Sequence, residues 1–370
     1  MTKYILSTIA GVESIAKKEI EKQGWKIIEV NDRSIEFEGD SKTMVRVNLW
    51  SRVGNKVYQV LEEGARIDDF DKLYDMVSKV DFKKYFHHDY PIIVKAKSIS
   101  SKLTATPSIQ KIVKKAIIDS ITDKSGEKVV EDRDLEKFEI MVVIINDKAK
   151  ILLNTSGEAL HKRWYRTETW DAPIKESLAA ALVLLSGWRF KQNFYDVFCG
   201  SGTIAIEAAM IAKNIAPGLD RYFAFENLVL VDKKLVTEEL ELAKTKSFEG
   251  DYKIIASDID EKVLEIAREN AKNAWVSDMI SFENKKFEDY LNEELKWTLV
   301  SNPPYWERLK VDFLDDLYKN IDKLLQKNPE LSGWVITSYF EWFDKIIKLS
   351  DYKKRKLYNG WEKCYFYRKK

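Results

Sequence analysis

An apolar run that ends in two consecutive prolines is the feature that most constrains the fold. Residues 297–300 predict a buried strand, which must end at Pro303 and Pro304 because proline cannot donate to a strand ladder and has a fixed φ. Asn302 is restricted as well, since the residue before a proline is held in extended conformations. The segment predicts a rigid turn at the carboxyl end of a strand, where open α/β sheets bind ligands.

The chemistry that such a turn suits is methylation of a planar exocyclic amine, whose lone pair is delocalised into its ring. If the Asn302 side-chain oxygen and the Pro303 carbonyl both accept from the amine, its nitrogen is drawn toward tetrahedral geometry and can attack an electrophile. Tyr305 would stack on the flipped base, and Pro304 would stiffen the turn. The alternative is an ordinary surface turn, because a short motif alone is a weak signal.

A glycine-rich loop follows a second predicted strand, residues 194–198. Gly200 and Gly202 let the backbone approach a ligand where a Cβ would block it. With Ala205 they also match a dinucleotide fingerprint, which is weak by itself. Asp258 ends the next predicted strand, and we expect its carboxylate to accept hydrogen bonds from two ribose hydroxyls.

Alternatives remain open for this acid. Asp258 could instead cap a helix, with Asp260 as the ribose ligand. A long charged insertion, residues 219–251, separates loop and acid by more than the roughly 20 residues of a dinucleotide fold. The coincidence of loop, acid and proline turn at strand ends favours S-adenosylmethionine over a nicotinamide cofactor, because hydride transfer has no need of the turn. The residues expected to bind the cofactor are Phe198, Gly200, Ser201, Gly202, Thr203, Asp258 and Ile259.

The two halves of the chain differ in pattern. Short strands and helices mix up to about residue 158, which predicts α+β units, whereas later helices alternate with apolar strands, as in a doubly wound α/β sheet. We predict domains at 1–50, 51–158 and 159–370. The last predicted element is a hairpin around Asn359-Gly360.

Basic residues gather in two places that could contact folded RNA through its phosphates. One is a predicted helix from Ser108 with the loop before it, and the other is the linker between the halves. The residues concerned are Lys102, Lys111, Lys114 and Lys115 in the first place, and His161, Lys162, Arg163 and Arg166 in the second. The alternative is a solvated helix face and a solvated linker with salt-bridging residues.

Composition limits the classes of protein. The 370 residues carry a net charge of +1, so a nucleic-acid partner must be argued from local patches. Two cysteines and three histidines predict no disulfide framework and no metal site, and fit a reducing cytoplasm. No apolar run reaches membrane-spanning length.

Over essentially the whole chain, the sequence resembles the THUMP-domain class I RNA methyltransferases of the bacterial 23S rRNA guanine-N2 type. The matching segments are 154–163, 172–176, 199–209, 214–218, 223–226 and 301–309, with a THUMP-like helix at 109–119. The resemblance implies a ferredoxin-like domain, a THUMP domain that binds RNA, and a class I (Rossmann-like) methyltransferase domain with a seven-stranded sheet. It implies that S-adenosylmethionine is the methyl donor and that the last strand of the sheet is antiparallel.

Two further readings stay open. The turn also serves methylation of a tRNA guanine-N2 or of an adenine-N6 amine, and an RNA-binding protein without activity would arise if Trp306 filled the pocket. Trp164, Trp275 and Trp306 stand where the resemblance leads us to expect glycine. One hypothesis covers all three: a source organism that reads the codon UGA as glycine.

Overall fold

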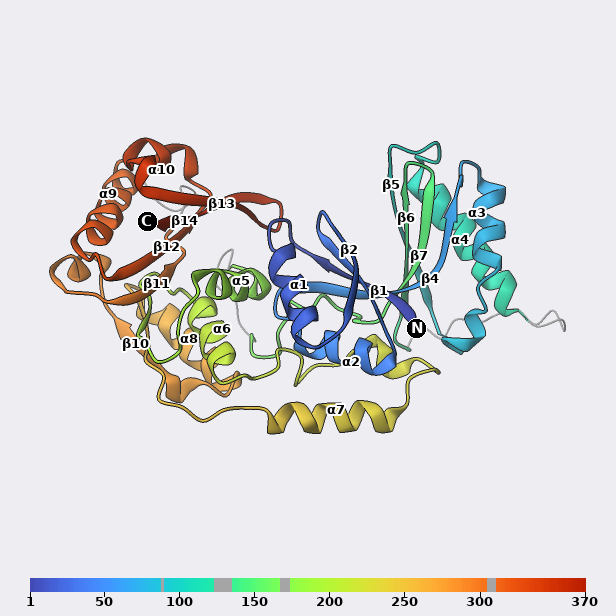
Figure 1. Cartoon of the computed structure of the whole chain (residues 1–370), viewed down its shortest axis with the longest axis horizontal. Coiled ribbons are helices and arrows are strands. Elements are labelled where there is room, and N and C mark those ends of the chain that lie inside the picture. Colours follow the sequence, from blue (N-terminus) through green and yellow to red (C-terminus); the bar gives the residue numbers. More distant parts are fainter. Residues whose placement is uncertain (88–89, 123–134, 167–173, 305–310) are drawn as a thin grey trace.

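The computed structural model describes residues 1–87, 90–122, 135–166, 174–304 and 311–370, and Figure 1 shows its elements. The described strands form two seven-stranded sheets, one in each half of the chain. The α/β class with a seven-stranded, Rossmann-like second half is therefore confirmed. No helix in the described ranges is long and apolar enough to cross a membrane.

The first sheet has the order β2-β3-β1-β4-β7-β6-β5. Its strands are β1 (Thr2–Thr8), β2 (Lys26–Asn31), β3 (Ser34–Gly39), β4 (Gly54–Ala65), β5 (Ile92–Ile99), β6 (Phe138–Ile145) and β7 (Lys148–Asn154), and its helices are α1 (Glu13–Lys22), α2 (Ser41–Trp50), α3 (Phe70–Ser78) and α4 (Thr106–Ile121). β4 pairs with β1 on one side and with β7 on the other. The first two predicted units therefore share one sheet.

The apolar stripe predicted for α4 is its buried face: Ile109, Val113, Ala116, Ile117 and Ile121 all lie in the core. Pro107 stands in the first turn, where its missing N–H costs no helical hydrogen bond. The lysines of this helix are left on its outer side.

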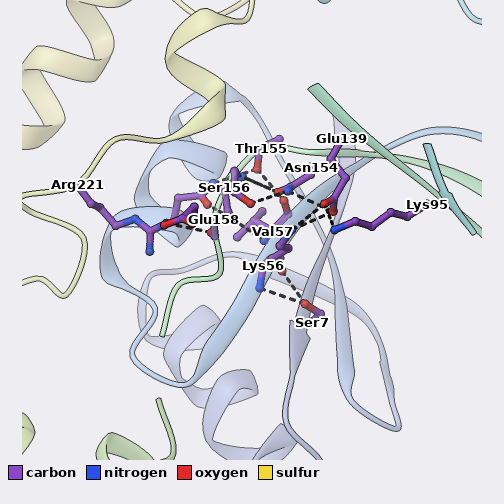
Figure 2. A network of polar contacts seen from close by, with 12 residues as sticks. Ser7, Lys56, Val57, Lys95, Glu139, Asn154, Thr155, Ser156, Glu158 and Arg221 are labelled. Atoms are coloured by element: carbon purple, nitrogen blue, oxygen red, sulfur yellow. Dashed lines mark hydrogen bonds and ion pairs between the residues drawn. The ribbon is translucent and has the colours of Figure 1, made fainter. Parts of the chain in front are cut away.

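A polar network fixes the chain where it leaves the first sheet (Figure 2). The Asn154 side chain donates to Glu139 at 3.4 Å and accepts from the Ser156 backbone N–H at 3.0 Å. The Ser156 hydroxyl accepts from the Val57 N–H at 2.8 Å, and Lys56 pairs with Glu139 at 2.9 Å. The connector after β7 is thus bonded to β4 and β6 rather than solvated.

The second sheet has the order β10-β9-β8-β11-β12-β14-β13. Its strands are β8 (Phe194–Asp196), β9 (Ile254–Asp258), β10 (Ile280–Asn284), β11 (Trp297–Ser301), β12 (Leu331–Thr337), β13 (Tyr352–Asn359) and β14 (Glu362–Lys369), and its helices are α5 (Glu176–Ser186), α6 (Thr203–Ala212), α7 (Lys233–Thr245), α8 (Glu261–Asn273), α9 (Val311–Lys327) and α10 (Phe340–Ile346). β8 to β12 are parallel, and β14 is antiparallel to β12, which confirms the expected antiparallel last strand.

The insertion 219–251 contributes no strand to this sheet and instead carries α7 back to the first half. Glu239 of α7 accepts from Arg46 Nε at 2.6 Å and from its second guanidinium nitrogen at 3.0 Å, and Lys42 Nζ lies 3.3 Å away. Arg46 and Lys42 belong to α2. Bidentate arginine–carboxylate pairs constrain geometry as well as attract, so α7 ties the halves together.

A second tie is the buried pair of Arg163 and Glu207, whose side chains are 1% and 0% exposed. Arg163 Nε lies 3.3 Å from Glu207 Oε1, to which the Tyr165 hydroxyl also donates at 3.1 Å. The guanidinium donates further to the Arg52 carbonyl at 2.6 Å. This corrects the expectation that Arg163 contacts RNA: its donors face protein acceptors inside the core, out of reach of a phosphate.

Replacing Arg163 with Met should lower the free energy of unfolding by about 3–5 kcal/mol, because Glu207 is left as a buried, unpaired charge. Combining it with Glu207→Leu should recover much of that loss. Urea unfolding followed by circular dichroism measures both.

The neighbouring exposed pair provides the control, since Lys162→Met removes only a surface partner of Glu158 and should cost less than about 1 kcal/mol. Equal effects at Arg163 and Lys162 would contradict a role for the buried pair.

Candidate active site

Three strand ends meet at one edge of the second sheet. β8 lies between β9 and β11, and both pairings are parallel, with Phe194 opposite Ile254 on one side and Thr298 on the other. The segments that follow these strands therefore leave the same edge. They are the glycine-rich loop after β8, Asp258 at the end of β9, and the Asn-Pro-Pro turn after β11.

The loop between β8 and α6 needs its two glycines for different reasons. Gly200 has φ 52° and Gly202 has φ 82°, backbone conformations that side chains other than glycine rarely adopt. A Cβ on Gly202 would lie 3.1 Å from the Ala267 Cβ, so this glycine also lets the loop pack on α8. A Cβ on Gly200 would meet no atom within 4 Å, so Gly200 borders open space where a ligand fits.

Asp258 is half-buried and is bonded to that loop. Its Oδ2 accepts from the Gly200 N–H at 3.0 Å, and its Oδ1 accepts from the Asp260 N–H at 3.1 Å. Asp260 is the N-cap of α8, accepting from the Lys262 N–H, so the capping alternative belongs to Asp260 and not to Asp258. The next residue, Ile259, is 65% exposed and offers an apolar surface beside the acid. These groups fit a nucleoside: lone pairs for ribose hydroxyls and an apolar side chain for a base.

A buried hydrogen-bond chain connects the loop with the proline turn. Ser301 donates to Asp196 Oδ1 at 2.6 Å and accepts from the Phe198 N–H at 3.1 Å. Burial raises the pKa of Asp196 to about 7. Neither Asp196 nor Ser301 was expected to matter, although both directly precede expected site segments. Their contact depends on the pairing of β8 with β11, which sequence alone does not specify.

The turn itself is described as far as Pro304. Asn302 and Pro304 are half-buried and Pro303 is buried, directly after the buried end of β11. Tyr305, expected to stack on the base, and Trp306 lie outside the described residues. The described part of the turn thus stands beside the cofactor loop, held there through Ser301.

The linker residues take different places. Lys162 is exposed and pairs with Glu158 at 2.6 Å. His161 contacts Asn55 at 3.2 Å, and burial together with nearby cations lowers its pKa to about 4. Arg166, with a side chain 10% exposed, pairs with Glu176 at 3.1 Å and donates to the Thr203 hydroxyl. Arg166 therefore contacts the start of α6, directly after the glycine-rich loop.

The four lysines expected to bind RNA lie on α4 and in the loop before it. Lys111 and Lys115 of α4 are exposed, and Lys114 is half-buried. Lys115 Nζ lies 5.9 Å from the Tyr74 ring centroid. Lys102 is exposed and pairs with Asp68 at 2.8 Å. Among the residues that the structure describes, no cluster of three or more His, Cys, Asp or Glu side chains could hold a metal ion.

Two parts of the chain match known protein families. Residues 163–368 match the family described as an RMKL-like methyltransferase domain, and residues 3–58 match the RlmL ferredoxin-like domain. The chain is 36% identical over 373 residues to the "Putative RNA methyltransferase YpsC" of Bacillus subtilis, covering 99% of this chain and 96% of that protein.

Solved structures that resemble the whole chain include the following two. The first is SMU.472 in complex with SAH, 35% identical with a TM-score of 0.89, covering 99% of this chain and 97% of that one. The second is described as a predicted N6-adenine-specific DNA methylase from Listeria monocytogenes, 34% identical with a TM-score of 0.90, covering 100% and 96%.

Asp258→Ala should weaken binding of S-adenosylmethionine by about 2–3 kcal/mol, because hydrogen bonds to a charged acceptor are lost. Isothermal titration calorimetry measures the change. Asp260→Ala is the control: it removes only a helix cap and should cost stability of about 1 kcal/mol without changing affinity. The reverse result would assign the ribose contact to Asp260.

Proposed function

Because the chain belongs to the RMKL-like methyltransferase family, we propose that it methylates RNA, at the exocyclic N2 amine of a guanine in 23S rRNA. The methyl donor is S-adenosylmethionine, as the family and the SAH complex of a 35% identical relative establish. The observation that carries the proposal is the meeting of cofactor loop, acid and Asn-Pro-Pro turn at neighbouring strand ends.

The residues around the loop supply what this cofactor needs. Asp258 would bind the ribose and Ile259 would cover the adenine, while the backbone from Phe198 to Thr203 would border the methionine part. The bound cofactor supplies an electrophilic methyl group. The exposure of Ile259 and the open space beside Gly200 support this placement.

Asn302 and Pro303 would orient the target amine. Two acceptors on one amine hold its hydrogens and point its lone pair at the methyl group, which is preorganised electrostatic and positional catalysis. Pro304 fixes the turn, and Tyr305 would stack on the flipped base. The Ser301 hydrogen bonds to Asp196 and Phe198 support this role, because they set the turn against the cofactor loop.

RNA would be held by the first half. We propose a ferredoxin-like unit at 1–50, a THUMP unit at 51–158 and the methyltransferase domain at 159–370, with Lys102, Lys111, Lys114 and Lys115 as phosphate contacts. The relative named as an RNA methyltransferase over nearly the full chain supports an RNA substrate. Of the four linker residues expected to contact RNA, Lys162 is the exposed one.

A second candidate is methylation of an adenine-N6 amine. The same turn serves that chemistry, and the Listeria protein of the same overall fold is described as a predicted N6-adenine-specific DNA methylase. The deciding experiment is mass spectrometry of modified nucleosides in RNA and DNA from cells with and without the gene. Loss of N2-methylguanosine from 23S rRNA would support the proposal, whereas loss of N6-methyladenine would refute it. No change in any nucleoside would indicate an inactive RNA-binding protein.

Asn302→Ala should lower turnover by at least about 10²-fold, as is typical when one preorganised polar group is removed from a reacting centre. Its affinity for S-adenosylmethionine should stay near that of the wild type, as measured by calorimetry beside single-turnover kinetics.

The control for Asn302→Ala is Asn193→Ala. Asn193 lies at the amino end of β8, away from the turn, and its amide donates to the Tyr195 hydroxyl. An Asn302 variant with normal single-turnover rate but weakened cofactor binding would give Asn302 a different role.

Changing Lys111, Lys114 and Lys115 together to Ala should raise the KM for RNA and make the affinity less dependent on salt, because phosphate contacts release counterions. Affinity for S-adenosylmethionine should not change. The matched control replaces three lysines of another helix, Lys233, Lys234 and Lys244 of α7. Indistinguishable effects of the two sets would mean that the α4 lysines are merely solvated.

A further inference from the structure

The β13–β14 hairpin is a strongly basic segment that the proposed function leaves unused. Residues 352–370 hold eight lysines and arginines and one acidic residue, Glu362, in a chain of net charge +1. Within the described ranges, only Lys354 of these eight pairs with a carboxylate, that of Asp344 at 2.7 Å. The rest of the chain is therefore net acidic, and the hairpin is a concentrated, mostly uncompensated positive charge.

Strand register places part of this hairpin beside the proline turn. Ser301 is level with Val335 of β12, and Thr337, two residues on, is opposite Tyr365 of β14. Tyr365 in turn pairs with Lys356 of β13. Neighbouring strands lie about 4.8 Å apart, so the chain at Tyr365 runs roughly 10 Å from the turn, at the same level of the sheet.

Cations and aromatic rings alternate on one face of this part of the hairpin. Lys356 Nζ lies 5.2 Å from the Tyr358 ring centroid, and Lys363 Nζ lies 5.5 Å from that of Tyr365. The guanidinium carbon of Arg33, from the first half, also lies 5.5 Å from the Tyr358 ring centroid. Three cations, Arg33, Lys356 and Lys363, thus lie beside the two tyrosines. Lys356 and Lys363 are exposed.

We propose that this hairpin face, defined as Lys356, Tyr358, Lys363 and Tyr365, binds the single-stranded RNA that flanks the target nucleotide. Lysines would contact phosphates and tyrosines would stack on bases, the combination that proteins use for single strands. The inference rests on the proposed RNA substrate and extends it to the neighbours of the methylated base. A flipped base requires its flanking strand to be held near the turn, which is where the face lies.

Two structural roles compete with this reading. Lysines on an edge strand prevent pairing with another sheet, and β13 is such an edge. The hairpin also reaches the start of α1 (Figure 1): Arg355 Nε donates to the Gly11 carbonyl before the helix at 3.0 Å, and its guanidinium donates to the Ser14 hydroxyl of α1 at 3.1 Å. Edge protection applies to every lysine of the strand, and the α1 contact belongs to Arg355. Neither role depends on Lys356 or Lys363 in particular.

The test compares two double variants of the full-length protein. Lys356→Gln with Lys363→Gln removes the cations of the face, and Lys353→Gln with Lys369→Gln removes two cations at the far end of the same hairpin. Binding of a fluorescein-labelled oligouridylate is measured by anisotropy over a range of salt concentrations. The first variant should bind roughly tenfold more weakly at about 0.1 M salt, with a salt slope reduced by about 1.4, since each single-strand phosphate contact contributes about 0.7. The second variant should bind like the wild type.

Crosslinking adds a readout that edge protection does not affect. An oligonucleotide containing 4-thiouridine should crosslink to Tyr358 or Tyr365 in the wild type and lose that crosslink in the first variant. Equal losses in both variants, or equally effective competition by polyglutamate and RNA, would overturn the proposal. A chain that shows the expected difference yet methylates no RNA would support the face and refute the proposed function.

A different observation carries a second inference, about the identity of two residues. Trp275 and Trp297 have φ of 60° and 86°, the left-handed region in which bulky residues are outliers. Trp275 follows the C-cap of α8, and its N–H and that of Val276 bond the Lys272 and Ala271 carbonyls at 3.0 Å. This is the Schellman pattern, whose left-handed residue is usually glycine.

Burial does not offset the strain, because Trp275 is 50% and Trp297 is 46% exposed. The composition also fits missing glycines. The chain has 14 glycines in 370 residues, about half of the average share of roughly 7%, and it has 11 tryptophans. We infer that residues 275 and 297 are glycine in the protein made by the source organism, encoded by UGA codons that this organism reads as glycine.

The codons and the purified native protein test this. UGA at both positions, together with tryptic peptides whose masses fit glycine, would support the inference. UGG codons, or peptides whose masses fit tryptophan, would overturn it. In a recombinant protein made with the printed sequence, Trp275→Gly should raise the melting temperature, whereas Trp188→Gly, in a buried aromatic cluster, should lower it.

Discussion

The buried pair of Arg163 and Glu207 is the interaction on which the arrangement of the two halves depends. A carboxylate removed from water needs a charged partner and further hydrogen bonds, and here the partner comes from the linker while the carboxylate comes from α6, directly behind the cofactor loop. Tyr165 donates to the same carboxylate. The linker, which precedes the first strand of the second sheet, is therefore part of the core of the second half.

The candidate site is built from the segments that follow β8, β9 and β11. In the proposed function, Asp258 and the glycines would bind the cofactor, and the turn after β11 would bind the substrate amine. Ser301 joins the two through one hydroxyl, accepting from the loop and donating to Asp196. This buried hydrogen-bond chain holds the loop and the turn in one geometry, which the proposed transfer between two bound molecules would require.

Much of this could be predicted from sequence, for identifiable physical reasons. Two consecutive prolines cannot donate to a ladder and so mark the end of a buried strand. Two glycines between a strand and a helix allow backbone conformations that other residues rarely adopt, which is why the turn and the loop could be located. The helical spacing of apolar residues likewise predicted α4. Partner choice could not be predicted: Arg163 looks like any linker cation until Glu207 is placed opposite it, and Ser301 meets Asp196 only through the register of β8 and β11.

The ion pair between α7 and α2 helps to fix the distance between the proposed RNA-binding surface and the proposed active site. Arg46 and Glu239 hold the insertion of the catalytic half against the first sheet, while the Arg163 pair holds the linker. These two ties restrict changes in the span from the α4 lysines to the Asn302 turn. An RNA docked on α4 would present to the turn only those nucleotides that lie one such span away, so the fold itself would select the target by distance, without reading its neighbours' bases.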